Sequence, residues 1–259
     1  MIFETHAHYD DEAFEKDRDE LLRALPENGI DTVVNIGASL ESCKDTIALM
    51  EKYPFVYGAI GVHPGETGEL TEESMQWLKE SCAVQKVVAV GEIGLDYHWK
   101  EPEISIQKKW FERQLIMAGE VGLPVIIHSR EAAKDTLDIM RSLHAQELGG
   151  VIHCFSYTKE TAREFLDMDY YFGIGGVLTF KNARKLREAA AYIPMERILL
   201  ETDSPYLAPE PNRGKRNSSL NLPYVAEELA AIKGISYEDV LAITYENAKR
   251  IFRMDRPAV

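Results

Sequence analysis

Cysteine is scarce in this sequence. The 259 residues include only Cys43, Cys82 and Cys154, which lie far apart and never form a Cys-x-x-Cys pair. An odd number of widely spaced cysteines argues against a disulfide framework and against a thiolate zinc site. We therefore expect the protein to work in a reducing compartment, the cytoplasm.

Long apolar runs are also missing. No run reaches the roughly 20 residues that a membrane-spanning helix needs. The first residues are strand-like at once, without a basic segment followed by a signal core. We expect a protein that has no membrane segment, and the sequence indicates no obligate protein partner.

Positive charge is in short supply. Lys and Arg number 29 against 43 Asp and Glu, so the formal net charge is −14. Because non-specific wrapping of nucleic acid needs a field of basic side chains, the net charge argues against that mode of binding. A small local basic site, or an acidic pocket for divalent cations, remains compatible with this charge.

The alternation of strand-like and helix-like segments indicates one α/β barrel. Short apolar runs alternate with amphipathic segments, including a predicted helix over Asp11–Leu25 and two more between Leu220 and Phe252. Eight such runs end near His8, Ile36, His63, Glu92, His128, His153, Ile174 and Asp203. Eight βα units without a break in composition predict a single (β/α)8 TIM barrel domain over residues 1–259.

Residues that bind metals or protons gather at the ends of these runs. In a parallel barrel all strands end on one face, so the residues there converge. They are His6, His8, His63, Glu92, His128, His153 and Asp203, and they include five of the seven histidines. His6 and His8, at i and i+2 of a strand, share a face.

The ligand types predict divalent metal ions. Imidazole with carboxylate suits zinc, manganese, iron or nickel, whereas magnesium prefers oxygen ligands and water. Four histidines and two carboxylates exceed the needs of one tetrahedral ion, which favours two ions roughly 3.5–4 Å apart. Glu92 is the best bridging candidate. Asp203, beside the first strand, is the candidate to accept the proton of an attacking water.

Six motifs in order resemble the TatD family of metal-dependent deoxyribonucleases, within the amidohydrolase-like barrels. The resemblance runs from His6 to Asn247. The motifs are Thr5-His6-Ala7-His8, Gly61-Val62-His63-Pro64, Gly91-Glu92-Ile93-Gly94-Leu95-Asp96, Pro124-Val125-Ile126-Ile127-His128-Ser129-Arg130, His153-Cys154-Phe155-Ser156 and Glu201-Thr202-Asp203-Ser204-Pro205-Tyr206. One departure is Glu4, where the family more often has Asp.

The resemblance implies a ligand set and an activity. One metal would be held by His6, His8, Glu92 and Asp203, and the second by Glu92, His128 and His153. It also implies magnesium-dependent 3′–5′ exonuclease action on DNA ends, with single-stranded DNA as the partner. From the ligand chemistry we expect magnesium as an activating ion rather than the tightly bound one.

Substrate contacts are expected from two further places. The segment Pro209–Ser219 reads as an active-site loop, in which Arg213 and Lys215, with Arg216, stand out in an acidic chain. Arginine forks suit phosphate. His63 precedes a proline, so substrate contact and a hydrogen bond within the turn are both open.

Two alternatives use the same residues. The first is a small-molecule amidohydrolase, lactonase or phosphotriesterase on the same metal barrel, which would need no basic loop. The second is a non-catalytic module that binds metal or nucleic acid.

By strand parity Glu201 points into the barrel below Asp203, where we expect a structural carboxylate.

Overall fold

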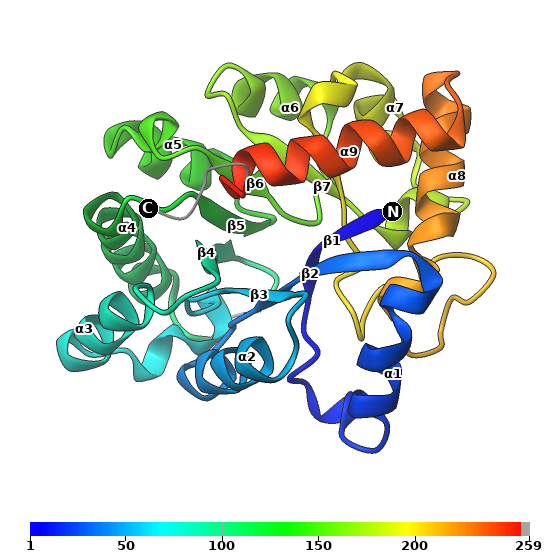
Figure 1. The fold of residues 1–259 in the computed structure, drawn as a ribbon. Helices are drawn as coiled ribbons and strands as arrows, with labels where there is room; N and C mark the ends of the chain where they lie inside the picture. Colours follow the sequence, from blue (N-terminus) through cyan, green and yellow to red (C-terminus); the bar gives the residue numbers. More distant parts are fainter. Residues whose placement is uncertain (100, 255–259) are drawn as a thin grey trace.

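Eight parallel strands surround the centre of the molecule (Figure 1) and pair in sequence order, β1 to β8. The structure is a computed structural model that describes residues 1–99 and 101–254. The strands are β1 Ile2–Ala7, β2 Ile30–Ile36, β3 Val56–Ala59, β4 Val87–Asp96, β5 Val125–Arg130, β6 Gly150–Ile152, β7 Tyr171–Ile174 and β8 Ile198–Leu200. They are rich in Val and Ile and almost entirely buried, as expected for a sheet covered on both faces.

The sheet closes between its first and last strands. Ala7 pairs with Ser204 in a parallel bridge just beyond the end of β8. The His8 amide donates to the Ser204 carbonyl at 2.8 Å, and the Asp203 amide donates to the His6 carbonyl at 2.9 Å. The predicted (β/α)8 barrel, an α/β fold in a single domain, is thereby confirmed.

All helices except the last form an outer ring around the strands (Figure 1). The helices are α1 Arg18–Ala24, α2 Leu40–Lys52, α3 Glu72–Ser81, α4 Ile104–Val121, α5 Ala133–Ser142, α6 Lys159–Leu166, α7 Arg184–Tyr192, α8 Leu222–Lys233 and α9 Tyr237–Ile251. One large apolar cluster joins the strands to this ring. No helix in the described residues is long and apolar enough to cross a membrane.

The last helix, α9, covers the end of the barrel at which the strands begin (Figure 1). Its residues Ala248, Ile251 and Phe252 belong to a second apolar cluster with strand residues. The strand residues of this cluster include Phe3, Val34, Ala89, Ile126, Val151, Tyr171 and Leu199. Because apolar side chains fill this end, the polar residues of the interior are confined to the opposite end.

The helix expected over Asp11–Leu25 is shorter than the sequence pattern predicts. A 3-10 turn occupies Glu12–Phe14, capped by the Asp11 carboxylate, and α1 begins only at Arg18. Phe14 is fully buried and the Arg18 guanidinium donates to the carbonyls of residues 9, 10 and 11. These contacts fold the segment back over the end of β1, which a continuous helix would prevent.

Candidate metal centre and active site

Six of the predicted residues converge at the carboxyl ends of the strands: His6, His8, Glu92, His128, His153 and Asp203. They lie in β1, β4 and β5 or directly after β1, β6 and β8, and all are within 4 Å of another member of the set. His6, Glu92 and His153 are buried. The parallel barrel thus brings together residues that are far apart in the sequence.

The carboxylate of Glu92 faces two groups of histidines. Its Oε2 lies 3.4 Å from Nε2 of His6 and 3.7 Å from Nε2 of His8. Its Oε1 lies 2.6 Å from Nδ1 of His128 and 3.5 Å from Nε2 of His153. Each oxygen of the Glu92 carboxylate therefore faces a different pair of histidines.

Asp203 joins the group around Oε2 of Glu92. Its Oδ1 lies 3.4 Å from Nε2 of His8, 3.6 Å from Nε2 of His6 and 3.9 Å from Nε2 of His153. Asp203 adopts a left-handed backbone conformation with φ of 59°, one that Asp tolerates better than most residues. That turn aims the carboxylate at the first strand.

The donor set fits divalent metal ions. Nε2 of His6 and Nε2 of His8 lie 3.2 Å apart, so both nitrogens face the same small volume. Among the described residues, Glu92 and Asp203 form ion pairs with histidines but with no lysine or arginine. Buried carboxylates and imidazoles in such numbers call for cations. Groups that include His6, His8 and Asp203, or Glu92, His128 and His63, have the spacing of metal ligands.

Hydrogen bonds orient two of the rings. Nδ1 of His8 lies 3.0 Å from the Ile36 carbonyl, which can only accept, so Nδ1 carries the proton and Nε2 is free to bind a cation. Nε2 of His128 lies 3.1 Å from Oδ2 of Asp96, which leaves Nδ1 facing Glu92. Such partners set which ring nitrogen binds a metal.

The cluster shifts the pKa values of its own acids. Burial disfavours the ionised form of Glu92, but His153, His128 and His6 hold the pKa of this carboxyl well below its usual value. Burial acts in the same sense on Asp203, yet His153, His8 and His6 lower its pKa. Both carboxylates are therefore ionised at neutral pH and available as ligands.

His63 lies at the edge of the cluster. Its Nδ1 accepts the Gly65 amide at 3.0 Å, so the turn hydrogen bond left open by the sequence is present. Its ring contacts that of His128, with centroids 4.4 Å apart. Burial and the neighbouring His128 lower the pKa of His63 to about 4, so the ring is neutral.

A cavity of about 780 Å³ opens beside the cluster. His8, His63 and Glu92 form part of its wall, together with Tyr206. The rest of the wall is strongly acidic and polar: Asp10, Asp11, Glu12, Ser39, Ser42 and Glu66. The side of the site near β1, β2 and β3 therefore attracts cations and repels phosphate.

The basic residues of the predicted loop do not line this cavity. Pro209–Ser219 is the connection from β8 to α8, as expected. Within it, Arg213 lies over the Phe180 ring, 4.2 Å from the centroid, and Lys215 is exposed. Arg216 pairs with Asp17 and donates to the Ala13 carbonyl, so it anchors the loop.

Two residues inside the barrel, Glu201 and Gly173, lie directly below the cluster. Glu201 lies in the barrel beneath Asp203, with Oε1 3.1 Å from Nδ1 of His153. Gly173 of β7 leaves the space that the Glu201 carboxylate occupies. Strand parity predicts the interior position of Glu201 but not the space at Gly173. A glycine at an inward position of a strand was the available signal.

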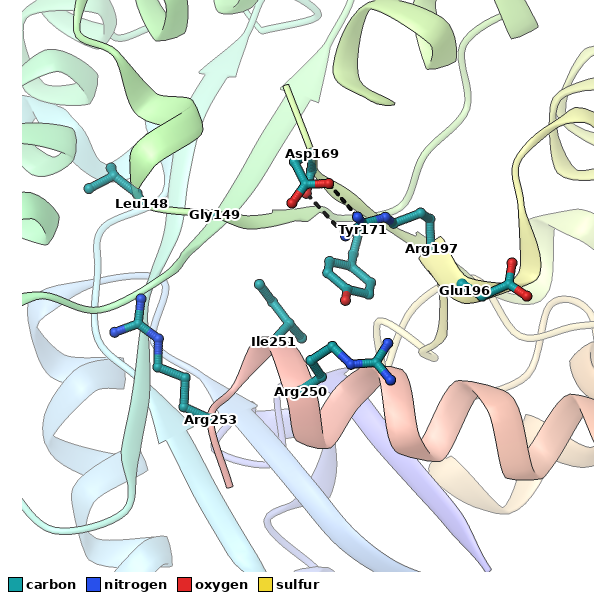
Figure 2. A pocket seen from close by; sticks show the side chains of 9 residues that line it. All are labelled: Leu148, Gly149, Asp169, Tyr171, Glu196, Arg197, Arg250, Ile251 and Arg253. Carbon is teal, nitrogen blue, oxygen red and sulfur yellow. Dashed lines mark hydrogen bonds and ion pairs between the residues drawn. The ribbon is translucent and has the colours of Figure 1, made fainter. Parts of the chain in front are cut away.

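A second cavity, of about 320 Å³, lies at the opposite end of the barrel (Figure 2). Three arginines line it, but Arg197 is paired with Asp169 and Arg253 donates to the Gly122 carbonyl. The remaining Arg250 lies on the last turn of α9. Figure 2 shows the side chains of Arg250 and Arg253 directed to different sides of Ile251. This cavity lacks the convergent donors of the metal cluster.

The fold and the site define a class of protein: a (β/α)8 barrel with a donor set that fits divalent metal ions at the carboxyl ends of its strands. Residues 3–253 match the family model described as TatD related DNase. The chain belongs to this family.

Individual relatives agree with that membership. The chain is 43% identical to an uncharacterized metal-dependent hydrolase, YabD, of Bacillus subtilis (strain 168), covering 98% of this chain and 100% of the relative. It is 34% identical to the 3′-5′ ssDNA/RNA exonuclease TatD of Cronobacter sakazakii, covering 92% and 93%. The crystal structure of YjjV, a TatD homologue from Escherichia coli K12, superposes with a TM-score of 0.92 at 29% identity, covering 97% and 98%. The protein is thus a metal-dependent hydrolase of the TatD family.

Proposed function

We propose that the protein hydrolyses phosphodiester bonds at the ends of single-stranded DNA, as a 3′–5′ exodeoxyribonuclease. The observation that carries the proposal is the position of Glu92 between two groups of histidines, beside an open cavity. The relative from Cronobacter sakazakii, named as a 3′-5′ ssDNA/RNA exonuclease, supports the choice of bond and substrate.

The residues divide into two proposed metal sites. His6, His8, Glu92 and Asp203 would hold one ion, and Glu92, His128 and His153 the other. Nitrogen-rich donor sets favour zinc, manganese, iron or nickel as tightly bound ions, with magnesium as an activating ion. When bound, two such ions lower the pKa of a water molecule and withdraw charge from a phosphoryl oxygen.

Protein groups supply the remaining steps. Asp203 is ionised and exposes 18% of its side chain, so it can accept the proton of the attacking water. The His63 ring, which lines the cavity with its Nδ1 already engaged, can offer Nε2 to a phosphoryl oxygen. Arg213 and Lys215 are proposed to hold phosphates of the same strand further from the reacting bond.

The decisive experiment uses single strands labelled at one end. Purified protein is stripped of metal, and manganese, zinc, nickel, iron or magnesium is restored singly. Shortening of a 5′-labelled strand one nucleotide at a time supports the proposal, whereas release of label from a 3′-blocked strand contradicts the polarity. Glu92→Ala should abolish turnover in each metal while the circular dichroism spectrum of the fold is retained.

A second candidate is a small-molecule hydrolase on the same barrel, which the acidic wall of the cavity favours. The two candidates differ in their need for Arg213 and Lys215. Neutralising both should weaken binding of a nucleic-acid strand and reduce its salt dependence. A hydrolase of lactones or phosphotriesters should keep its rate, so a panel of both substrate classes separates the candidates.

A further inference from the structure

The two sides of the site differ in charge. Near β1 to β3, four carboxylates line the cavity. Beyond Asp203, the connections after β7 and β8 carry six exposed basic residues, of which Arg184 and Arg216 form ion pairs. We call the other four the basic rim: Lys181, Lys185, Arg213 and Lys215. A negatively charged strand that reached the metal centre would be repelled on the first side and attracted on the second.

The two connections that form the basic rim are held together. The Glu210 amide donates to Oγ1 of Thr179 at 2.9 Å, and Arg213 stacks on Phe180. Lys181 follows Phe180 directly, so cations from separate segments lie on one continuous surface.

Most charge on the basic rim is uncompensated. In the described part of the chain, Lys181, Lys185 and Arg213 form no ion pair, and Lys215 contacts only the Asn212 side chain. The neighbouring Arg184 is paired with Glu188 and is not counted. One carboxylate, that of Glu210, lies within the same loop.

We propose that the basic rim binds the phosphate backbone of a single nucleic-acid strand, so that the strand leaves the metal centre over β7 and β8. This inference rests on the proposed function and adds the path of the substrate. Exposed lysines and arginines in a row are the groups that hold a flexible phosphate backbone.

The test compares two charge-reversed double variants of the full chain. Lys181→Glu with Lys185→Glu alters the basic rim. Arg23→Glu with Arg250→Glu makes the same charge change on exposed residues of α1 and α9, at the other end of the barrel. Binding of a fluorescent, hydrolysis-resistant phosphorothioate strand is measured over a range of salt concentrations.

The rim variant should bind at least about tenfold more weakly at low salt, with a smaller dependence on salt concentration. The control variant should resemble the unmodified protein. Equal affinities of the two variants for the strand would contradict the proposal that the basic rim binds it, even if the unmodified protein cleaves DNA. A rim-dependent affinity without any cleavage of phosphodiesters would instead overturn the proposed function.

A separate observation concerns Glu201. Its side chain is buried, and its Oε1 accepts the Cys154 amide at 2.5 Å and lies 3.1 Å from Nδ1 of His153. Its Oε2 and Nδ1 of His153 have no hydrogen-bond partner among the described residues, so the 3.1 Å contact between Oε1 and Nδ1 is an ion-pair contact. A buried carboxylate with an unsatisfied oxygen is costly, so its presence needs a reason beyond packing.

Gly173 makes room for this carboxylate. A Cβ at residue 173 would lie 1.9 Å from Oε2 of Glu201 and 2.4 Å from its Cδ. Any larger residue at position 173 would therefore displace the Glu201 carboxylate from His153. The absence of a side chain at Gly173 is therefore what allows the Glu201 carboxylate to lie beside His153.

We infer that Glu201 is a positioning residue for His153. Its carboxylate attracts the proton to Nδ1, which leaves the electron pair of Nε2 directed toward Glu92 and Asp203, at 3.5 and 3.9 Å. The inference rests on the proposed role of His153 as a metal ligand.

The test measures manganese and zinc affinity by competition with a chelator. Glu201→Ala should lower the affinity roughly 10- to 100-fold. Gly173→Ala should act in the same direction, and should have no further effect when combined with Glu201→Ala, because the methyl group then meets no carboxylate. In the zinc-loaded protein, nitrogen NMR of the His153 ring should show a protonated Nδ1 in the unmodified protein and a shifted Nδ1 resonance in both single variants, because the carboxylate that accepts from Nδ1 is removed or displaced.

Gly175→Ala is the matched control, since its Cβ would lie 3.3 Å from the Glu201 backbone carbonyl and 3.7 Å from its Cγ. Retained metal affinity and an unshifted Nδ1 resonance in Glu201→Ala, with affinity lost in His153→Ala, would overturn the positioning role and leave the proposed function intact. Retained affinity in His153→Ala would instead show that the proposed ligand set is wrong.

Discussion

Oδ1 of Asp203 lies 3.4 Å from Nε2 of His8, across the seam where the last strand meets the first. The contact depends on two backbone hydrogen bonds in that seam, from His8 to Ser204 and from Asp203 to His6. The hydrogen bonds that close the barrel therefore also place Asp203 beside His6 and His8 in the proposed metal site.

Glu92→Gln should remove the negative charge of the proposed bridging residue while keeping its size. The amide keeps the volume but offers one oxygen in place of two, so both proposed metal sites lose a ligand. We expect metal content to fall and hydrolysis to drop by more than about 100-fold, the upper range for losing an outer-shell partner. Elemental analysis and end-labelled strand assays measure both. Full metal content with full activity would contradict the bridging role.

Metal uptake should release protons. Burial opposes the charged form of His8, but Asp203, Glu92 and Asp10 raise its pKa to about 9. Burial likewise opposes the charge of His153, yet Glu201, Glu92 and Asp203 raise its pKa to about 10. At neutral pH these rings hold protons that a metal must displace, so affinity should rise with pH. Calorimetric titration of the apoprotein in buffers of different ionisation enthalpy measures the protons released, and a heat independent of buffer would refute this.

Asn247 should contribute to the stability of the fold, because its side chain links α9 to the beginning of β8. Its side-chain amide donates to the carbonyls of Met195 at 2.7 Å and Ile198 at 2.9 Å, and it is 2% exposed. Asn247→Ala leaves both carbonyls without this partner, so unfolding free energy should fall by about 1–3 kcal/mol. Urea denaturation measures the change. The exposed neighbour Glu246, replaced by Ala, is the control and should change stability far less.

Gly61→Ala should disturb the strand that carries Glu92. A Cβ at residue 61 would lie 2.8–2.9 Å from backbone atoms of Gly91, which cannot move aside as a side chain can. We expect a loss of about 1–3 kcal/mol in unfolding free energy, together with reduced metal affinity. Thermal unfolding and chelator competition provide the two measurements. Gly68→Ala, whose Cβ would lie 3.8 Å from Pro102, should change neither; equal behaviour of the two variants would contradict the close approach.

Local sequence periodicity was sufficient to predict the barrel, because each buried strand and each amphipathic helix is encoded in a short segment. The same reasoning predicted that His6, His8, Glu92, His128, His153 and Asp203 would meet, since parallel strands all end on one face. It extended the first helix too far toward Asp11, because the burial of Phe14 and the contacts of Arg18 are tertiary.

Side-chain pairing between distant strands was decided by the tertiary structure alone. Which oxygen of Glu92 faces which histidine, and the space that Gly173 leaves for Glu201, depend on register and tilt around the closed barrel. Arg216 is committed to Asp17 while Arg213 lies on Phe180, although the two are near neighbours in the sequence. Sequence spacing sets the face and the end at which a side chain emerges, but the partner it meets depends on strands that are remote along the chain.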